Sequence, residues 1–270
     1  MRPTAMTLEF PQTYARDLYI SWHNNSVPED IDIVTRLDAI RSELKSSSHS
    51  SLATLSQLLT QIKAFTEKEC KVRFKGISQG QFSVPTTQFS PQPSNKGFDL
   101  LFKSSDSILE KLWRKNLKRS ANYASLRNLR LEITDLVRTS VVAPTLGHAR
   151  LFAERLENWR DIVDPPDIEK YFAEIDRVEV DMESKLASGY FAFHSNVRFK
   201  SGLCIEVQIY SQLSEAWRSI SHKLYETTRL KESLATGAGS AEARLVSLGH
   251  LLHLAECELD RLAIDFTKPR

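Results

Sequence analysis

The sequence predicts an α/β (α+β) domain with one central mixed β-sheet flanked by helices and with extra helices at both ends of the chain. Three observations support this class. Residues 190–210 alternate apolar and polar side chains, as strands do. Residues 31–69 and 212–264 carry apolar side chains at helical spacing. The order is helix-rich, then mixed, then β-rich, then helical again, and the 270 residues suffice for one large domain with helical additions.

Composition excludes several classes of protein. Apolar residues make up 41% and charged residues 26% of the chain, so we expect a folded, soluble protein. The net charge of +2 does not argue for nucleic acid as a partner. Cys70, Cys204 and Cys257 form neither a metal motif nor a disulfide framework, which suits a reducing cytoplasm. No membrane partner is expected, because no apolar run approaches about 18 residues.

The first third of the chain is predicted to be a helical extension. It covers residues 1–75, and residues 31–45 and 52–69 are expected to form amphipathic helices on either side of a serine-rich break. Residues 76–97 are rich in proline, glycine and serine, which predicts a long loop and the clearest internal boundary.

Residues 98–230 are predicted to form the core of the domain. Residues 97–103 look strand-like, and a helix should begin near Ser105. The later predictions, in order, are a β-rich run at 131–143, a helix at 146–159, a break at Pro165-Pro166, and a helix at 168–183 that leads into a short extended piece.

The strongest β signal is a hairpin made of residues 190–199 and 203–210. Residues 200–202 connect the strands, with glycine at the left-handed position of a three-residue loop. Apolar faces must lie on the same side of the sheet, so Phe199 should pair with Leu203. This register places His194 opposite Gln208 and Asn196 opposite Glu206, which collects polar groups on one face.

Two helices are expected to close the chain. The first covers about 212–229 and should turn Leu213, Trp217, Ile220 and Leu224 inward; a flexible turn follows at 235–242. The second covers about 241–264, within a segment 231–270 that should pack on the core or on a partner. Its predicted inward residues are Leu245, Leu248, Leu252, Leu259 and Leu262.

The helix after Ser105 combines features of a phosphate site. Ser107, Lys111 and Lys115 recur every four residues and stack on one face, with Arg114 beside them and Lys103 just upstream. The first turn of a helix also offers free N–H groups to an anion. The alternative is an ordinary capped helix, with Ser104 or Ser105 as N-cap and a solvated basic face.

Two carboxylates and two aromatic groups lie in the β-rich runs. Asp135 and Glu206 are each surrounded by apolar residues, where a carboxylate is costly unless it is paired or binds a cation such as Mg²⁺. A salt bridge with Arg138 is the simpler explanation for Asp135. Tyr190 and His194 share a strand face and could form a base-stacking platform or an ordinary half-buried strand. Zincin, P-loop and α/β-hydrolase motifs are absent from the sequence.

Four segments, in this order, resemble the synthetase domain of RelA/SpoT-type (p)ppGpp synthetases, in particular the small alarmone synthetase family. They are FKSSDSILEKLWRK (102–115), ITDLVRTSVV (133–142), GYFAFH (189–194) and IEVQIYSQLSEAWRSISHKLYE (205–226). The resemblance implies a nucleotidyltransferase-like mixed sheet. It also implies a pyrophosphokinase that transfers the β,γ-pyrophosphate of ATP to the ribose 3′-hydroxyl of GDP or GTP.

The resemblance also implies roles for individual residues. ATP would be bound by Lys103, Ser107, Lys111, Arg114, Lys115 and Arg138. Asp135 and Glu206 would hold Mg²⁺ and, with Gln208, serve catalysis. The acceptor nucleotide would be bound by Tyr190, His194, Asn196 and His222.

The chain departs from the family pattern at three arginines, which are replaced by Phe102, Ser140 and Tyr210. No His-Asp pair is present, so synthesis without hydrolysis is expected. One alternative is a toxic branch of the family that pyrophosphorylates the 3′ CCA end of tRNA and is neutralised by an antitoxin protein. Another is a catalytically inactive module that senses nucleotides. The terminal helices could pack on the domain, form a homo-oligomer or hold such a partner.

Overall fold

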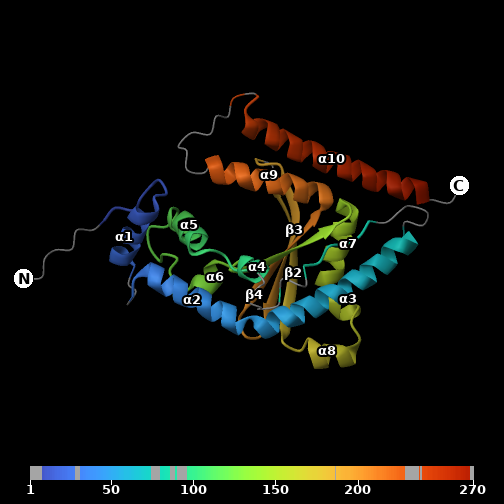
Figure 1. Cartoon of the computed structure of the whole chain (residues 1–270), viewed down its shortest axis with the longest axis horizontal. Coiled ribbons are helices and arrows are strands. Elements are labelled where there is room, and N and C mark those ends of the chain that lie inside the picture. The colour runs from blue at the N-terminus through green and yellow to red at the C-terminus, as the bar shows by residue number, and fades with distance from the viewer. Residues whose placement is uncertain are drawn as a thin grey trace, which may run out of the picture.

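The computed structural model describes residues 8–27, 31–73, 80–85, 89, 96–185, 187–228, 237 and 239–267 (Figure 1). The strands are β1 (Val137–Ala143), β2 (Ile175–Lys185), β3 (Tyr190–Phe199) and β4 (Cys204–Ser211). The helices are α1 (Arg16–Ser26), α2 (Ile33–Ser47), α3 (His49–Arg73), α4 (Lys96–Leu100), α5 (Ser105–Asn116), α6 (Leu129–Glu132), α7 (Leu146–Glu157), α8 (Pro165–Tyr171), α9 (Gln212–Thr228) and α10 (Ala241–Thr267), with a 3₁₀ turn at Trp159–Asp161.

The centre of the fold is a mixed sheet with strand order β1-β4-β3-β2. β1 is parallel to β4, and the other two pairs are antiparallel. α7 packs against all four strands, and α3 packs on the outer side of α7. The predicted α/β class with a central mixed sheet and flanking helices is therefore confirmed.

One hydrophobic core joins the sheet to the N-terminal helices. Val197, Val207 and Ile209 on the covered face of the sheet are fully buried, and so is Leu55 of α3. Tyr19 of α1 belongs to the same cluster. The packing of α1, α2 and α3 around this cluster removes their apolar side chains from water. This burial is the main source of the stability of the three helices.

The hairpin of β3 and β4 has the predicted register. Phe199 N–H donates to the carbonyl oxygen of Leu203 at 2.9 Å, and Gly202 has φ +82° in the loop. His194 lies opposite Gln208, and Asn196 lies opposite Glu206. Because alternate side chains of a strand point to one face, these polar groups share the face that α7 does not cover.

The prediction of a helix at 168–183 was wrong. The only helix in this region is the short α8, which begins at Pro165, where proline costs nothing because its missing N–H would have no partner. Residues 175–185 form β2, an edge strand paired only with β3. Its side chains alternate between half-buried Val178 and Val180 and exposed charged residues, which is the period of a strand with one solvated face.

Two shorter segments also differ from the prediction. Residues 97–103 are not a strand: α4 ends at Leu100, and only Phe102 makes a β-bridge, to Val137. The β-rich run at 131–143 begins as α6 and becomes a strand only at Val137. Asp135 therefore lies in the turn that precedes β1, not within the strand.

Both C-terminal helices exist, but their predicted inward stripes are mostly wrong. On α9, Trp217 is buried, whereas Leu213 and Ile220 are exposed. On α10, Leu248, Leu259 and Leu262 are exposed, and Gly249 and Glu256 are the buried positions. The physical reason is that small and polar residues of α10 pack against the domain.

Most of the predicted loop at 76–97 and of the turn at 235–242 lies outside the described residues. Within the loop, Ser83 forms a β-bridge with Val142 of β1. No helix among the described residues is both long and apolar enough to span a membrane.

Candidate functional site

A carboxylate held by two lysines lies where α5 meets the start of β1. The Nζ of Lys103 is 2.6 Å from Oδ2 of Asp135, and the Nζ of Lys111 is 2.7 Å from its Oδ1. The side chains of Asp135 and Lys103 are nearly buried, at 12% and 9% exposure. The result is a compact group with two positive charges and one negative charge.

Backbone pairing fixes this group in place. Lys103 N–H donates to the carbonyl oxygen of Leu136 at 2.9 Å, and Arg138 N–H donates to that of Leu101 at 2.8 Å. These two bonds align residues 101–103 beside the turn that carries Asp135. α5 begins immediately afterwards and delivers Lys111 after nearly two turns.

The charges dominate the protonation of this group. Burial alone would raise the pKa of Asp135, but the charges of Lys103 and Lys111 and their hydrogen bonds outweigh burial and lower that pKa to about 2. Burial lowers the pKa of Lys103, and the neighbouring carboxylate opposes that shift. Asp135 is therefore an anion throughout the neutral range.

The other predicted phosphate-binding residues divide into two groups. Ser107 lies in the first turn of α5, where its N–H donates to Oγ of the N-cap Ser104 at 3.2 Å. Lys115 is held elsewhere, 3.4 Å from Oε2 of Glu132. The structure therefore brings Ser107 to the N-terminal end of the helix that carries Lys111, and it turns Lys115 toward α6.

Arg114 and Arg138 also occupy different surroundings. The guanidinium of Arg114 is half exposed and lies 3.7 Å from Glu110. Arg138 is the first charged residue of β1, close enough to Lys103 to lower the pKa of that ammonium slightly. Of these two arginines, Arg138 is the one beside the lysine–aspartate group.

Arg41 of α2 also reaches the group, and it was not predicted as a site residue. Its Nε donates to the carbonyl oxygen of Lys103 at 2.9 Å, and its Nη1 is 3.5 Å from Oγ of Ser105. Only the packing of α2 against α5 brings it there. A search of the sequence for polar residues at odds with their apolar surroundings could not find it, because Arg41 lies on the polar side of an amphipathic helix.

The second part of the site is a closed ring of hydrogen bonds on the open face of the hairpin. The hydroxyl of Tyr190 contacts Nε2 of His194 and the hydroxyl of Tyr210, both at 2.8 Å. Nδ1 of His194 is 2.9 Å from Oε1 of Glu206. Gln208 closes the ring by donating to Oε2 of Glu206 at 2.7 Å and accepting from the Tyr210 hydroxyl at 2.8 Å.

The direction of the hydrogen bond from Tyr210 to Gln208 fixes the directions of its neighbours in the ring. Tyr210 donates to Gln208, so Tyr190 must donate to Tyr210, and His194 must donate to Tyr190 through Nε2. The remaining link joins Nδ1 of His194 to Oε1 of Glu206. The carboxylate therefore lies next to an imidazole, a side chain that can receive or return a proton.

Tyr210 is the ring member that was not predicted as a site residue. It is fully buried, and burial raises the pKa of its hydroxyl to about 12, so it remains a proton donor. The guanidinium of Arg218 lies 4.8 Å from the centre of the Tyr210 ring and is itself bound by Glu215. The alternation of β4 places Tyr210 on the polar face, which was a usable signal.

The two parts of the site adjoin one another. Arg138 of β1 lies opposite Glu206 of β4 in the parallel register. Burial raises the pKa of the Cys204 thiol, and the carboxylates of both Glu206 and Asp135 add to that shift, so both carboxylates are within electrostatic range of one sulfur atom. Asn196 faces the same thiol, with Oδ1 3.7 Å from it.

His222, also predicted as an acceptor-binding residue, is exposed on α9, five residues beyond Trp217. The sequence therefore predicted the strand neighbours of β3 and β4 correctly, whereas Arg114 and Lys115 are held by Glu110 and Glu132, outside the two groups.

The carboxylates of the site suit a metal that arrives with a phosphate substrate. Among the described residues, no group of three or more His, Cys, Asp or Glu side chains is placed to hold a metal ion. Asp135 and Glu206 each have both oxygens engaged by nitrogen donors. Mg²⁺ is commonly bound by one or two carboxylates plus substrate phosphates and water, so two carboxylates without a preformed cage fit it.

No known family model matches the sequence, and no curated protein matches it. The structure is similar to solved small alarmone synthetases. Small alarmone synthetase 1 from Bacillus subtilis has a TM-score of 0.46 and 17% identity over 81% of this chain and 96% of that chain. The same enzyme bound to its product pppGpp has a TM-score of 0.45 and 17% identity over 90% and 96% of the two chains.

A GTP pyrophosphokinase family protein from Streptococcus pneumoniae has a TM-score of 0.42 and 13% identity over 87% of this chain and 90% of that chain. At identities this low the chemistry has to be argued from the side chains themselves.

Proposed function

We propose that this chain is a pyrophosphokinase that transfers the β,γ-pyrophosphate of ATP to the ribose 3′-hydroxyl of a nucleotide. The observation that supports it is the meeting of two unlike groups on one sheet. Two lysines at α5, the buried Lys103 and the half-buried Lys111, adjoin a carboxylate, Glu206, that is hydrogen-bonded to a histidine and a glutamine. The first group suits a polyphosphate, and the second suits a hydroxyl that must lose its proton.

The donor would bind through the lysine–aspartate group. Lys103 and Lys111 would exchange Asp135 for phosphate oxygens, with Ser107 and the first N–H groups of α5 adding neutral donors. Asp135, released from the lysines, and Glu206 would hold Mg²⁺, which neutralises phosphate charge when bound. Arg138 would lie against the adenine or the α-phosphate.

The acceptor hydroxyl would be activated by Glu206. The 3′-oxygen attacks the β-phosphorus of ATP, so that a bond from O3′ to Pβ forms while the bond from Pβ to the α,β-bridging oxygen breaks and AMP leaves. The hydroxyl proton passes to the Glu206–His194 pair, and Gln208 holds the carboxylate in position. Such transfer requires mainly positioning and charge neutralisation, which this set of residues supplies.

GDP and GTP are the acceptors that we favour. Tyr190 lies at the open end of the hairpin, where its ring can stack on a base once its hydroxyl leaves the ring of hydrogen bonds. His194 and Asn196 follow on the same strand face and can hold the ribose and the base edge. On this proposal the product is the alarmone ppGpp or pppGpp, and no hydrolase activity accompanies its synthesis.

The 3′ end of tRNA is a second candidate acceptor, favoured by Tyr210. Where the family resemblance places an arginine for acceptor phosphates, this chain has a buried, neutral hydroxyl that is bound within the ring. Residues 111–130 carry basic side chains and no acidic ones, which suits a phosphate backbone. A toxic activity of this kind would require an antitoxin partner.

A transfer assay tests the proposal. Purified protein with γ-labelled ATP and Mg²⁺ should move label to GDP or GTP, or to tRNA, when each is offered separately. Glu206→Gln and Asp135→Asn should abolish transfer, whereas Glu179→Gln, an exposed carboxylate paired with Arg198, should not. Label on a guanine nucleotide supports alarmone synthesis, and label on tRNA supports the second candidate. No transfer to any acceptor would contradict both and favour a nucleotide-binding module.

A further inference from the structure

An arginine of α9 lies over one end of the hydrogen-bond ring. The guanidinium carbon of Arg218 is 4.8 Å from the centre of the Tyr210 ring, and the Arg218 side chain is 23% exposed. α9 begins directly after β4 and packs against β4 and β3, which brings residue 218 over residue 210. The face of the tyrosine attracts the cation and helps to fix its position.

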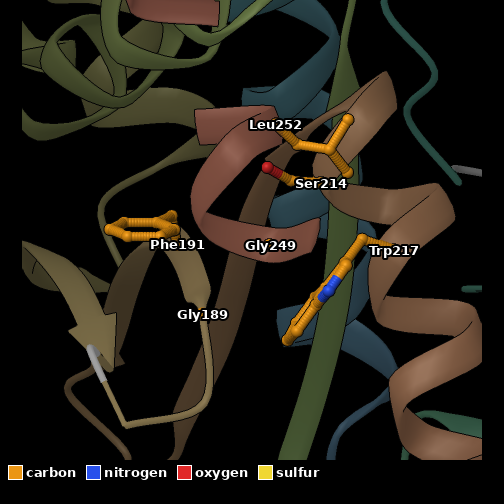
Figure 2. A pocket seen from close by; sticks show the side chains of 6 residues that line it. All are labelled: Gly189, Phe191, Ser214, Trp217, Gly249 and Leu252. Atoms are coloured by element: carbon orange, nitrogen blue, oxygen red, sulfur yellow. The ribbon is translucent and has the colours of Figure 1, made fainter. Parts of the chain in front are cut away.

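Trp217, the neighbour of Arg218, anchors α9 at the same end of the ring. Its indole is tilted against Tyr190, with ring centres 6.4 Å apart, and its N–H donates to the carbonyl oxygen of Leu245 at 2.8 Å. The indole is buried and lines one small hollow with Gly189, the residue before Tyr190 (Figure 2). Packing therefore sets the position of Arg218 relative to the tyrosine that is proposed to stack on the acceptor base.

The Arg218 guanidinium is bound by a carboxylate in the geometry that a phosphate group would use. Its Nε and Nη2 donate to the two oxygens of Glu215 at 2.7 and 2.9 Å. Arginine binds carboxylates and phosphates through the same planar fork of N–H donors. A phosphate group can therefore replace Glu215 while the arginine stays where it is.

The pair of Arg218 and Glu215 is one that a phosphate can displace. The two residues are three apart on one helix, and their side chains are 23% and 27% exposed. Partly exposed pairs at this spacing contribute little to stability. Glu215 also lies in the first turn of α9, where the helix dipole stabilises a carboxylate that has lost its partner.

This location matches the 5′ side of the acceptor nucleotide. On the proposed function, on which this inference rests, the acceptor 3′-hydroxyl lies at Glu206 and the base stacks on Tyr190. From Glu206, β4 runs to Tyr210 and α9, away from the turn of Asp135 that precedes the parallel strand β1. The base and the 5′-carbon of a nucleotide extend from the ribose away from O3′, so the 5′-phosphate comes to the end of the ring where Arg218 lies.

We propose that Arg218 binds the 5′-phosphate of the acceptor nucleotide in place of Glu215, so that the chain prefers nucleoside diphosphates and triphosphates to nucleosides. His222 is four residues further along α9 and lies on the same side of the helix, where it extends the site along the phosphate chain. The acceptor phosphates are then bound by α9, and the donor phosphates are bound at α5.

A comparison of GDP with guanosine tests this site without relying on catalysis. Equilibrium dialysis is done with saturating α,β-methylene-ATP, which occupies the donor site and cannot transfer its pyrophosphate. We expect wild type to bind GDP at least about tenfold more tightly than guanosine. Arg218→Gln should remove most of this difference and leave the affinity for guanosine unchanged, whereas a residue with only a structural role would change both affinities alike. Arg218→Lys keeps the charge but not the fork and should retain part of the difference.

Glu215→Gln distinguishes the two roles of the ion pair by sign. If the pair only stabilises α9, loss of either partner weakens binding. If the carboxylate competes with the phosphate, Glu215→Gln should strengthen the binding of GDP and leave that of guanosine unchanged. Arg155→Gln is the matched control and should change neither affinity, because Arg155 donates to both oxygens of Glu69 at 2.7 Å, between α7 and α3.

Transfer assays give a second readout. In Arg218→Gln, kcat/KM for GDP should fall at least about tenfold, whereas KM for ATP should not change. No transfer in wild type, together with the expected pattern of GDP binding, would contradict the proposed pyrophosphokinase and still support the phosphate site.

Each of three results would overturn the phosphate site itself. The first is a wild-type chain that binds GDP no more tightly than guanosine. The second is an affinity for GDP that Arg218→Gln does not lower. The third is a loss of GDP binding in Glu215→Gln as large as that in Arg218→Gln.

Discussion

Asp135 is the residue for which the effect of a substitution on the free energy of unfolding can be calculated most directly. It is nearly buried and neutralises two ammonium groups, so its pKa falls from 3.8 to about 2. A shift of that size corresponds to about 2 kcal/mol of stabilisation. Asp135→Asn removes this term and leaves the buried ammonium of Lys103 without its counter-charge, which adds further cost. We expect the free energy of unfolding to fall by about 3 kcal/mol.

The lowered pKa of Asp135 also predicts how its contribution to the free energy of unfolding changes with pH. Because the folded pKa is below the unfolded value, the stabilisation is complete above about pH 4 and is lost as pH falls toward about 2. Urea unfolding, followed by tryptophan fluorescence from pH 8 to pH 3, should therefore show a constant difference between wild type and Asp135→Asn that shrinks only below pH 4.

Asp17→Asn is the control, because the side chain of Asp17 is 92% exposed and its pairing should contribute little. An Asp135→Asn variant less than about 1 kcal/mol below wild type, or a difference that grows below pH 4, would refute the reasoning.

Three further predictions follow from other contacts. Burial raises the pKa of Glu256. The protonated carboxyl therefore contributes stability to the fold below about pH 4.5, and this contribution is lost as the pH rises. Glu256→Gln should raise the melting temperature at pH 8 but not at pH 4. Gly249→Val, whose side chain would collide with the β2–β3 turn, should speed hydrogen exchange in α10, whereas Gly237→Ala, with open space around it, should not. Tyr210→Phe breaks the hydrogen-bond ring and should lower the transfer rate about tenfold without weakening ATP binding, whereas the exposed Tyr171→Phe should not; equal effects of the two would contradict a role for the ring.

The hairpin was the most predictable part of the fold. Strict alternation from Tyr190 to Tyr210 fixes which side chains share a face, and one glycine in a three-residue loop fixes the register. Those two local rules were enough to place His194 opposite Gln208 and Asn196 opposite Glu206, as the structure has them.

Tertiary contacts decided the parts that the sequence did not predict. β2 is an edge strand whose exposed face is highly charged, and charged residues are common in helices, so its alternation was overlooked. For α10 the helix itself was predicted correctly, but the side of it that packs on the domain was not, because the period of apolar residues does not say which surface covers them. Gly249 and Glu256 are buried against the domain, whereas Leu248, Leu259 and Leu262 are exposed.

Individual residues of the site were named from the sequence, but the contacts between them were not predicted. Asp135 and Lys103 were both named, yet their direct contact depends on the turn before β1 and on backbone bonds between distant segments. Arg41 could not be predicted, because it reaches the group from a helix 62 residues away along the chain. Tyr210 departs from the family pattern in the sequence. That it closes the hydrogen-bond ring follows only from the relative positions of Tyr190, Gln208 and Tyr210 in the fold.

The nucleotide released during transfer tests the central claim most directly. Purified protein, ATP, Mg²⁺ and the acceptor that takes up label should be sampled over time, and AMP, ADP and modified acceptor measured together. The account predicts one AMP for each acceptor that gains a pyrophosphate group, with both the β- and γ-phosphates of ATP found on its 3′-oxygen. ADP in place of AMP, or modified acceptor from the Glu206→Gln variant at the wild-type rate, would contradict it.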